Sequence, residues 1–265
     1  MHLLFDIGGT KSRFATSEGN ELKNIKIVET PQVFDQGIQE FKNYVSLLKI
    51  NKLDGIAGGI AGPLDNKKSM VLNAPNLPGW NNMPFKEELF KYFNTNIKIE
   101  NDAALNGVGE ATKGAGRDKS IVMFLTISTG VGGGRIVNGK IDENAVGFEP
   151  GHQYIPIKNS AELQSLEAII SGTALKNKYH LNPDEITDEK IWNDCAYYLA
   201  LGIHNSILHW SPEVVVLGGS IMNKISIEKT TNNLNNLMDI FPEIPEIKNA
   251  ELGDKAGLYG AITLL

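Results

Sequence analysis

The sequence predicts an α/β fold made of two domains of similar design, and three features of the chain indicate it. Runs of apolar residues alternate with helical spacing along the 265 residues, as expected when strands and helices share a core. A unit of strand, glycine-rich turn and returning strand occurs in each half, at Leu3–Thr10 and at Phe124–Gly130. The chain is also long enough for two domains of ordinary size.

The elements of the first half are expected in a regular order. The apolar run Leu3–Phe5 precedes a glycine turn, so the chain is expected to return antiparallel over residues 13–17. Apolar residues at helical spacing predict a helix over 36–50. A strand over 53–60 follows and is expected to enter a glycine turn over residues 58–63 that includes Gly58, Gly59 and Gly62.

The second half repeats this pattern with longer elements. Strands over 121–127 and 135–137 are expected to flank a second glycine turn, which we predict to include residues 130–134. A long helix over 189–209 then leads into a strand over 213–217.

Composition excludes several functional classes. The 25 Lys and Arg against 31 Asp and Glu give a net charge of −6, which argues against a nucleic acid or an anionic membrane as partner. The single cysteine, Cys195, excludes an intramolecular disulfide, and its place on an apolar helical stripe predicts a buried, unreactive thiol. The N-terminus lacks the pattern of a signal peptide, and no apolar run has the length of a membrane helix. We therefore expect a soluble cytoplasmic protein.

The glycine turns match neither common phosphate-binding motif. In the run that begins at Gly130, an arginine replaces the third glycine of the dinucleotide fingerprint, and a strand follows in place of a helix. The run from Gly134 fits a P-loop only as far as Ile141, which stands where a Mg²⁺-binding Ser or Thr is required. Hairpin turns of Gly and Thr could instead offer backbone N–H groups to a phosphate, with Asp6 near Mg²⁺. Ordinary β-hairpins with glycine turns are the alternative.

Several carboxylates could carry chemistry. Asn101 and Asp102 stand where a short strand over 97–100 ends and a helix begins at about Ala103. Asp102 could be a general base, with Asn101 hydrogen-bonding a substrate hydroxyl, although Asn and Asp are also the preferred caps of a helix.

Two further carboxylates lie in the second half. Glu149 and His152 follow a glycine-rich loop and could bind adjacent sugar hydroxyls, or lie in a solvated loop. Glu167 stands beside an apolar helical stripe and is either exposed or directed at a ligand.

In these segments the chain resembles the ROK family (repressor, open reading frame, kinase). The resemblance covers essentially the whole chain, because seven short motifs occur in the order typical of the family. These motifs are Asp6-Ile7-Gly8-Gly9-Thr10-Lys11, Ala74-Pro75-Asn76-Leu77-Pro78-Gly79-Trp80, Glu100-Asn101-Asp102, Thr129-Gly130-Val131-Gly132-Gly133-Gly134, Glu149-x-Gly151-His152, Leu217-Gly218-Gly219 and Leu252-Gly253-Asp254-Lys255-Ala256-Gly257-Leu258-Tyr259-Gly260-Ala261.

The resemblance implies an actin/hexokinase-like fold of two RNase-H-like domains with an interdomain cleft. We expect a small domain over 1–115 plus 250–265 and a larger one over 116–249. The implied reaction is transfer of the γ-phosphoryl group of ATP to the 6-hydroxyl of a hexose, with glucose favoured and with Mg²⁺ as cofactor. N-acetylglucosamine and N-acetylmannosamine are alternative substrates, and a homodimer is implied.

The resemblance also implies roles for individual residues. Asp102 is similar to the catalytic base, and Asp6 to the carboxylate that holds Mg²⁺ through water. The implied sugar ligands are Asn76, Asn101, Asp102, Glu149, His152 and Glu167. The implied nucleotide ligands are Asp6, Gly8, Gly9, Thr10, Lys11, Thr129, Gly130, Gly218 and Gly219.

Three positions depart from the family pattern. Residues 153–166 hold none of the cysteines that form a zinc loop in many members, so no structural zinc is expected. Ser128 replaces a glycine before the second phosphate turn, and Pro150 replaces an aliphatic residue. Two rival functions remain open. A sugar-responsive repressor would need a helix-turn-helix before Leu3, where we expect no room for one, and a catalytically silent sensor would not need an intact Asp102.

Overall fold

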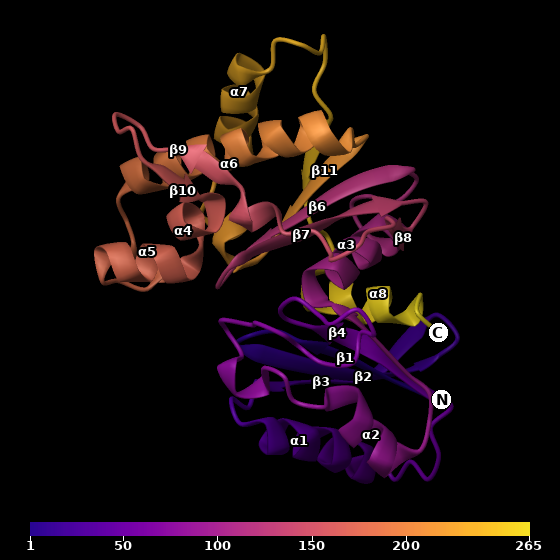
Figure 1. The fold of residues 1–265 in the computed structure, drawn as a ribbon. Coiled ribbons are helices and arrows are strands. Elements are labelled where there is room, and N and C mark those ends of the chain that lie inside the picture. Colours follow the sequence, from indigo (N-terminus) through magenta and orange to yellow (C-terminus); the bar gives the residue numbers. More distant parts are fainter. The chain divides into compact units, whose positions relative to one another are not determined.

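A computed structural model describes residues 1–265 of the chain. It shows an α/β protein, as predicted, with two five-stranded mixed sheets and a small two-stranded sheet (Figure 1). The chain divides into two compact units, one made of residues 1–109, 143–147 and 254–265 and the other of residues 110–142 and 148–253. None of its helices combines the length and the apolar character that a membrane span requires.

The sheet of the first unit has the order β3-β2-β1-β4-β5. Its strands are β1 (His2–Ile7), β2 (Lys11–Glu18), β3 (Glu21–Glu29), β4 (Gly55–Ile60) and β5 (Ile97–Asn101). Strands β1, β2 and β3 form antiparallel pairs, whereas β1, β4 and β5 run parallel. Figure 1 shows α1 (Phe34–Leu47) and α2 (Phe85–Phe93) on one face of this sheet and α8 (Ala256–Ile262) on the other.

Aromatic side chains fill the space between this sheet and its helices. Phe41 of α1 makes edge-to-face contacts with Phe5 and Phe14, with ring centroids 5.3 Å and 5.0 Å apart. Trp80 is 2% exposed, as expected of a core residue, and its indole N–H donates to the Pro31 carbonyl at 2.9 Å. Gly37 is required in α1 because a Cβ there would lie 2.1 Å from the Trp80 ring. The first core is thus specified by ring packing.

The sheet of the second unit has the order β12-β11-β6-β7-β8. Its strands are β6 (Ile121–Ile127), β7 (Val131–Val137), β8 (Lys140–Ile141), β11 (Val214–Gly218) and β12 (Glu246–Asn249). Strands β6, β7 and β8 form antiparallel pairs, and β6, β11 and β12 run parallel. Both sheets therefore share one strand order and one pattern of directions, which confirms the repeated design predicted from the sequence.

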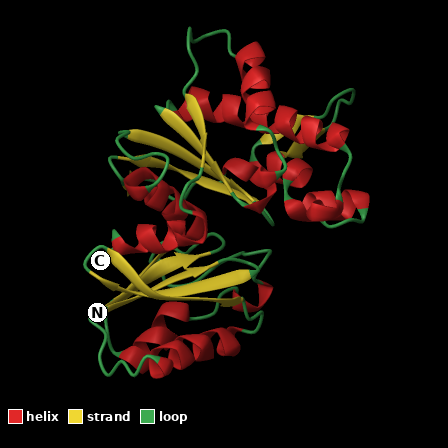
Figure 2. Cartoon of the chain, turned by 180° about the vertical axis from the view of Figure 1, so that it is seen from behind, coloured by secondary structure: helices red, strands yellow, loops and turns green.

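Most of the other strands and α-helices belong to the second unit, and α3 starts in the first unit and ends in the second. They are α3 (Asp102–Lys113), β9 (Tyr154–Pro156), β10 (Leu163–Ser165), α4 (Leu166–Ile170), α5 (Gly172–Tyr179), α6 (Glu189–Trp210) and α7 (Ile227–Leu237). Side chains of α6 form one core with those of β6 and β11. Figure 2 shows the helices of this unit from the opposite side.

Cys195 lies in this second core and is 3% exposed. Burial raises the pKa of its thiol from 9.0 to about 12. The thiol is thus buried and protonated, as predicted from its place on the apolar stripe of α6.

Two predictions about glycines are wrong. Gly132, Gly133 and Gly134 do not belong to the turn after β6, because they pair with Thr126, Leu125 and Phe124 as part of β7. Gly133 is there for packing, since a Cβ would lie 2.3 Å from the Phe124 carbonyl oxygen and 3.0 Å from the Pro150 ring. Likewise, Gly58 and Gly59 lie within β4 rather than in a turn.

Candidate functional site

The carboxyl ends of three parallel strands bring two predicted site segments to one edge of the first sheet. Across β1, β4 and β5, Asp6 is in register with Gly59, and Gly59 with Glu100. Asp6 therefore lies near the end of β1, Asn101 is the last residue of β5, and Asp102 follows it on the same side. Carboxyl ends of parallel strands are where open α/β sheets bind ligands.

Asp6 is a nearly buried carboxyl group, with 3% of the residue exposed. Burial raises its pKa from 3.8 to about 6, against the lowering effect of the Arg13 guanidinium, and the Asp254 charge adds to the increase. Nη1 of Arg13 donates to Oδ2 of Asp6 at 3.4 Å. A Cβ on Gly257 would lie 2.7 Å from Cγ of Asp6, so the backbone of α8 packs directly on the carboxyl group.

The turn between β1 and β2 holds the predicted phosphate residues Gly8, Gly9, Thr10 and Lys11. The Gly8 N–H donates to the Lys11 carbonyl at 3.0 Å, which closes the turn. The side chains of Thr30 and Gln32 donate to the carbonyls of Gly8 and Gly9 at 2.7 and 3.1 Å, so hydrogen bonds from the segment after β3 fix these two oxygens.

Asn76 packs against this turn. A Cβ on Gly9 would lie 2.6 Å from Cβ of Asn76, so the turn has to be glycine at that point. The structure therefore brings the predicted sugar ligand Asn76 to the predicted phosphate turn.

Asn101 and Asp102 both bind the start of α3. Oδ1 of Asn101 accepts the Ala104 N–H at 3.0 Å and its amide donates to the Gly62 carbonyl at 3.2 Å. Oδ1 of Asp102 accepts the Ala103 N–H at 2.8 Å. The capping predicted as one alternative is present at Asn101, while the bond of Asp102 to the next residue orients its carboxylate in the first turn of α3.

Gly59 allows Asp102 to approach β4. A Cβ on Gly59 would lie 2.8 Å from Cα of Asp102. Gly58 and Gly59 of β4 thus serve close packing, and Gly59 lies directly against the predicted base.

In the second unit, the turn between β6 and β7 carries Thr129 and Gly130. The Ser128 N–H donates to the Gly130 carbonyl at 2.8 Å. The start of α5 is fastened to this turn, because the N–H groups of Gly172 and Thr173 donate to the carbonyls of Ser128 and Thr129 at 2.7 and 3.2 Å. Ser128, which departs from the family pattern, takes part in the turn through its backbone.

Glu149, His152 and Glu167 meet near the start of β7. Oε2 of Glu167 accepts the Val131 N–H at 2.8 Å, so this carboxylate is directed at the backbone next to the turn rather than at solvent. A Cβ on Gly151 would lie 2.1 Å from the Val131 carbonyl oxygen, which presses the segment with Glu149 and His152 onto the same residue.

Two neighbouring charges act on Glu149, which is an exposed residue. Desolvation by the surrounding chain nevertheless raises the pKa of its carboxyl; the charge of His152 lowers it and that of Glu167 raises it. His152 and Glu167 thus lie within electrostatic range of Glu149.

Gly218 is the last residue of the parallel strand β11, and Gly219 follows it. Gly219 has φ of 94°, which favours glycine, and a Cβ there would lie 2.2 Å from the Ile127 carbonyl oxygen. The pair therefore lies against the end of β6, where the turn with Thr129 and Gly130 begins.

Arg13 and Asp254 were not predicted as site residues. Nε of Arg13 donates to Oδ1 of Asp254 at 2.8 Å, and Arg13 also contacts Asp6. One signal was available, since Arg13 lies on the strand that returns from the phosphate turn. The contact with Asp254 spans almost the whole chain, and no local pattern could indicate it.

A Mg²⁺ ion fits the surroundings of Asp6. The Arg13 contact of 3.4 Å is longer than a strong charge-assisted hydrogen bond, so the carboxylate retains capacity to accept one from metal-bound water. No three His, Cys, Asp or Glu side chains are grouped to hold a metal ion. Mg²⁺ commonly takes one or two carboxylates and completes its shell with substrate phosphates and water.

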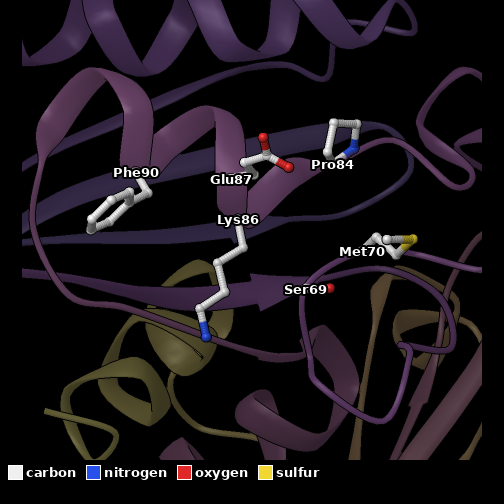
Figure 3. A pocket seen from close by; sticks show the side chains of 6 residues that line it. All are labelled: Ser69, Met70, Pro84, Lys86, Glu87 and Phe90. Atoms are coloured by element: carbon white, nitrogen blue, oxygen red, sulfur yellow. The ribbon is translucent and has the colours of Figure 1, made fainter.

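A separate surface pocket lies at the start of α2 (Figure 3). None of the predicted site residues lines it. Its lining residues are Ser69, Met70, Pro84, Lys86, Glu87 and Phe90.

Comparison with known proteins identifies relatives along the whole chain. The model of the ROK family matches residues 3–265. An uncharacterized protein from Clostridium perfringens is 30% identical over 97% of this chain and 95% of its own. A glucokinase from Thermotoga maritima is 27% identical over 98% of this chain and 95% of its own. Fructokinases and N-acetyl-D-glucosamine kinases match at 25–28% identity.

Solved structures show the same fold. The ROK hexokinase from Thermus thermophilus superposes with a TM-score of 0.83 at 25% identity, over 98% of this chain and 96% of its own. This likeness confirms the predicted actin/hexokinase-like fold.

Proposed function

Since the chain belongs to the ROK family, we propose that it is an ATP-dependent sugar kinase that transfers the γ-phosphoryl group to the 6-hydroxyl of a hexose. One observation carries the proposal: the parallel strands of the first unit hold Asp6 and its glycine turn at the same edge as Asn101 and Asp102. A phosphate-binding turn, a cation-binding carboxylate and a general base are the groups that phosphoryl transfer to an alcohol requires.

The roles follow from the reaction. Phosphoryl transfer has a loose transition state, so the protein mainly positions the reactants and stabilises charge. Asp102 accepts the proton of the attacking hydroxyl, and Asn101 hydrogen-bonds the sugar beside it. Mg²⁺ would be held near Asp6 through water and would neutralise charge on the phosphates of ATP.

The remaining residues bind the two substrates. Backbone N–H groups of Gly8, Gly9, Thr10 and Lys11, and of Thr129 and Gly130, would bind phosphate oxygens, because such turns form anion-binding nests. Gly218 and Gly219 would face the nucleoside. The other sugar ligands in this proposal are Asn76, Glu149, His152 and Glu167.

Glucose is the favoured substrate, supported by the glucokinase and hexokinase among the relatives. N-acetylhexosamines are the second candidate, supported by the N-acetyl-D-glucosamine kinases that match this chain at 27% identity. Fructose joins them because relatives at 25–28% identity include fructokinases.

An ADP-release assay over a panel of hexoses and N-acetylhexosamines tests this proposal. We expect Mg²⁺-dependent ADP release with at least one aldohexose, glucose giving the highest kcat/KM, and a product carrying phosphate at the 6-position. Saturable ATP binding without turnover on any sugar of the panel would contradict kinase activity and favour a silent sensor. A preference for an N-acetylhexosamine would keep the reaction and correct the substrate.

We also propose that the protein acts in the cytoplasm as a homodimer, as the family resemblance implies. Light scattering on the purified chain would measure the oligomeric state, and a monomer at all concentrations would contradict this part of the proposal.

A further inference from the structure

Arg13 stands directly opposite Asp6 in the antiparallel pairing of β1 and β2. Its guanidinium contacts two carboxylates that are far apart in the sequence. Nε donates to Oδ1 of Asp254 at 2.8 Å, and Nη1 donates to Oδ2 of Asp6 at 3.4 Å. The side chain of Arg13 is 19% exposed, while those of Asp254 and Asp6 are 50% and 5% exposed.

We propose that Arg13, anchored by Asp254, is a positioning residue that orients the Asp6 carboxylate for the complex of Mg²⁺ and nucleotide. This inference rests on the proposed kinase function. It adds to that function two residues on which the orientation of Asp6 depends: Arg13 on β2 and Asp254 just before α8.

The lengths of the two contacts support the direction of this dependence. Arg13 makes its shorter bonds, through Nε and Nη2, to Asp254 and its longer one to Asp6. Nε and Nη2 both donate to the single oxygen Oδ1 of Asp254, which fixes one edge of the planar guanidinium. The fixed guanidinium in turn limits how the Asp6 carboxylate can rotate.

A second wall completes the arrangement. A Cβ on Gly257 would lie 2.7 Å from Cγ and 2.9 Å from Oδ2 of Asp6. Because Gly257 and Asp254 belong to the same short segment, one stretch of chain supplies both the anchor of Arg13 and the surface against which Asp6 packs.

Charge alone predicts the opposite effect, and this makes the proposal testable by sign. A guanidinium next to a cation site repels Mg²⁺, so removing Arg13 would tighten metal binding if its charge were all that mattered. If Arg13 positions Asp6, removing it weakens metal binding, since residues that orient a ligand typically contribute about 10–100-fold to metal affinity.

The experiment measures Mn²⁺ binding in the presence of ADP by electron paramagnetic resonance, with the full chain at alkaline pH so that carboxyl groups are ionised. For Arg13→Ala we expect about tenfold weaker Mn²⁺ binding. Arg13→Lys should recover part of it, and Asp254→Asn should weaken it less than Arg13→Ala. Steady-state assays should show a higher Mg²⁺ requirement with an unchanged KM for the hexose.

Arg117→Ala is the matched control, because Arg117 pairs with Glu251 at 2.7 Å and both side chains are about half exposed. It should leave Mn²⁺ binding unchanged. Unchanged or tighter binding in Arg13→Ala and Asp254→Asn would overturn the proposal, whereas thermal unfolding identifies a variant that has lost its fold. Wild-type binding of Mn²⁺ with ADP but no turnover on any hexose would contradict the kinase function alone. Absence of wild-type binding would overturn both.

Discussion

Asp102 combines a local structural contact with the position expected of a base. One of its carboxylate oxygens accepts the Ala103 N–H at 2.8 Å at the first turn of α3. This bond holds the carboxylate at the strand ends. A base in phosphoryl transfer accepts its proton late, so orientation matters more than basicity.

Replacing Asp102 by Asn tests this role. Asn keeps a side-chain oxygen that can accept the Ala103 N–H, so the fold and sugar binding should persist. Turnover should fall by about 10²–10⁴-fold, the usual contribution of a general base. The measurements are ADP release and calorimetric sugar binding. Asp35→Asn is the control, because Asp35 also lies in the first turn of a helix, α1, and should not affect turnover. Turnover close to that of the wild type would exclude Asp102 as the base.

Cys195 gives a prediction about pH. The pKa of its thiol is raised from 9.0 to about 12 by burial, so the folded state binds this proton more tightly than the unfolded state. The corresponding stability is complete below about pH 9 and is lost as the pH rises toward 12.

The variant Cys195→Ala should therefore lose less stability than the wild type between pH 9 and 12. Urea unfolding at several alkaline pH values measures the difference in slope. The wild-type thiol should also resist alkylation at neutral pH until the chain unfolds. Parallel pH profiles or rapid alkylation of the folded chain would show that the thiol is not buried in solution.

At the scale of elements, strand β7 shows where local pattern fails. Its glycine run was predicted to form a turn because glycine disfavours strands. The run is a strand because β6 lies alongside it and the segment around Pro150 packs over it, which leaves no room for side chains. By contrast, α6 was predicted over 189–209 and spans Glu189–Trp210, because its long apolar stripe is a local property.

Gly133→Ala should consequently destabilise the protein. A Cβ would lie 2.3 Å from a backbone oxygen that is fixed by the sheet, so strain of about 1–3 kcal/mol is expected. Gly55→Ala is the control, since this glycine also lies in a strand. The atom nearest to a Cβ at Gly55 would belong to the His2 ring, at 3.2 Å, and not to the backbone. Thermal unfolding of both variants measures the effect. Equal stabilities would contradict the packing account of the glycine run.

At the scale of the whole molecule, the sheets of the two units have the same strand arrangement. The order β3-β2-β1-β4-β5 of the first sheet corresponds to the order β8-β7-β6-β11-β12 of the second. In each unit the first strand of the sheet, β1 or β6, is joined to its antiparallel neighbour, β2 or β7, by the glycine turn. The repeat explains why the two candidate phosphate turns occupy corresponding places, after β1 and after β6.

Metal removal is predicted to affect activity but not the fold. The Mg²⁺ site proposed at Asp6 is completed by substrate, and no group of three or more ligating side chains holds a structural ion. A strong chelator should abolish ADP release, added Mg²⁺ should restore it fully, and the unfolding temperature should stay constant. A chelator-induced loss of structure, or recovery only with Zn²⁺, would show that a structural metal was overlooked.

The sequence by itself determined the α/β class, the repeated strand–turn–strand unit, the burial of Cys195 and the ordered motifs, because each follows from local spacing or from short segments. Tertiary structure alone decided which distant groups meet. Arg13 reaches Asp254, Gly257 packs on Asp6, and Glu110, fully buried, accepts the Leu252 N–H at 2.8 Å. These contacts join segments that are more than 140 residues apart in the chain, and their residues carry no periodicity, since their positions are set by the packing of whole elements.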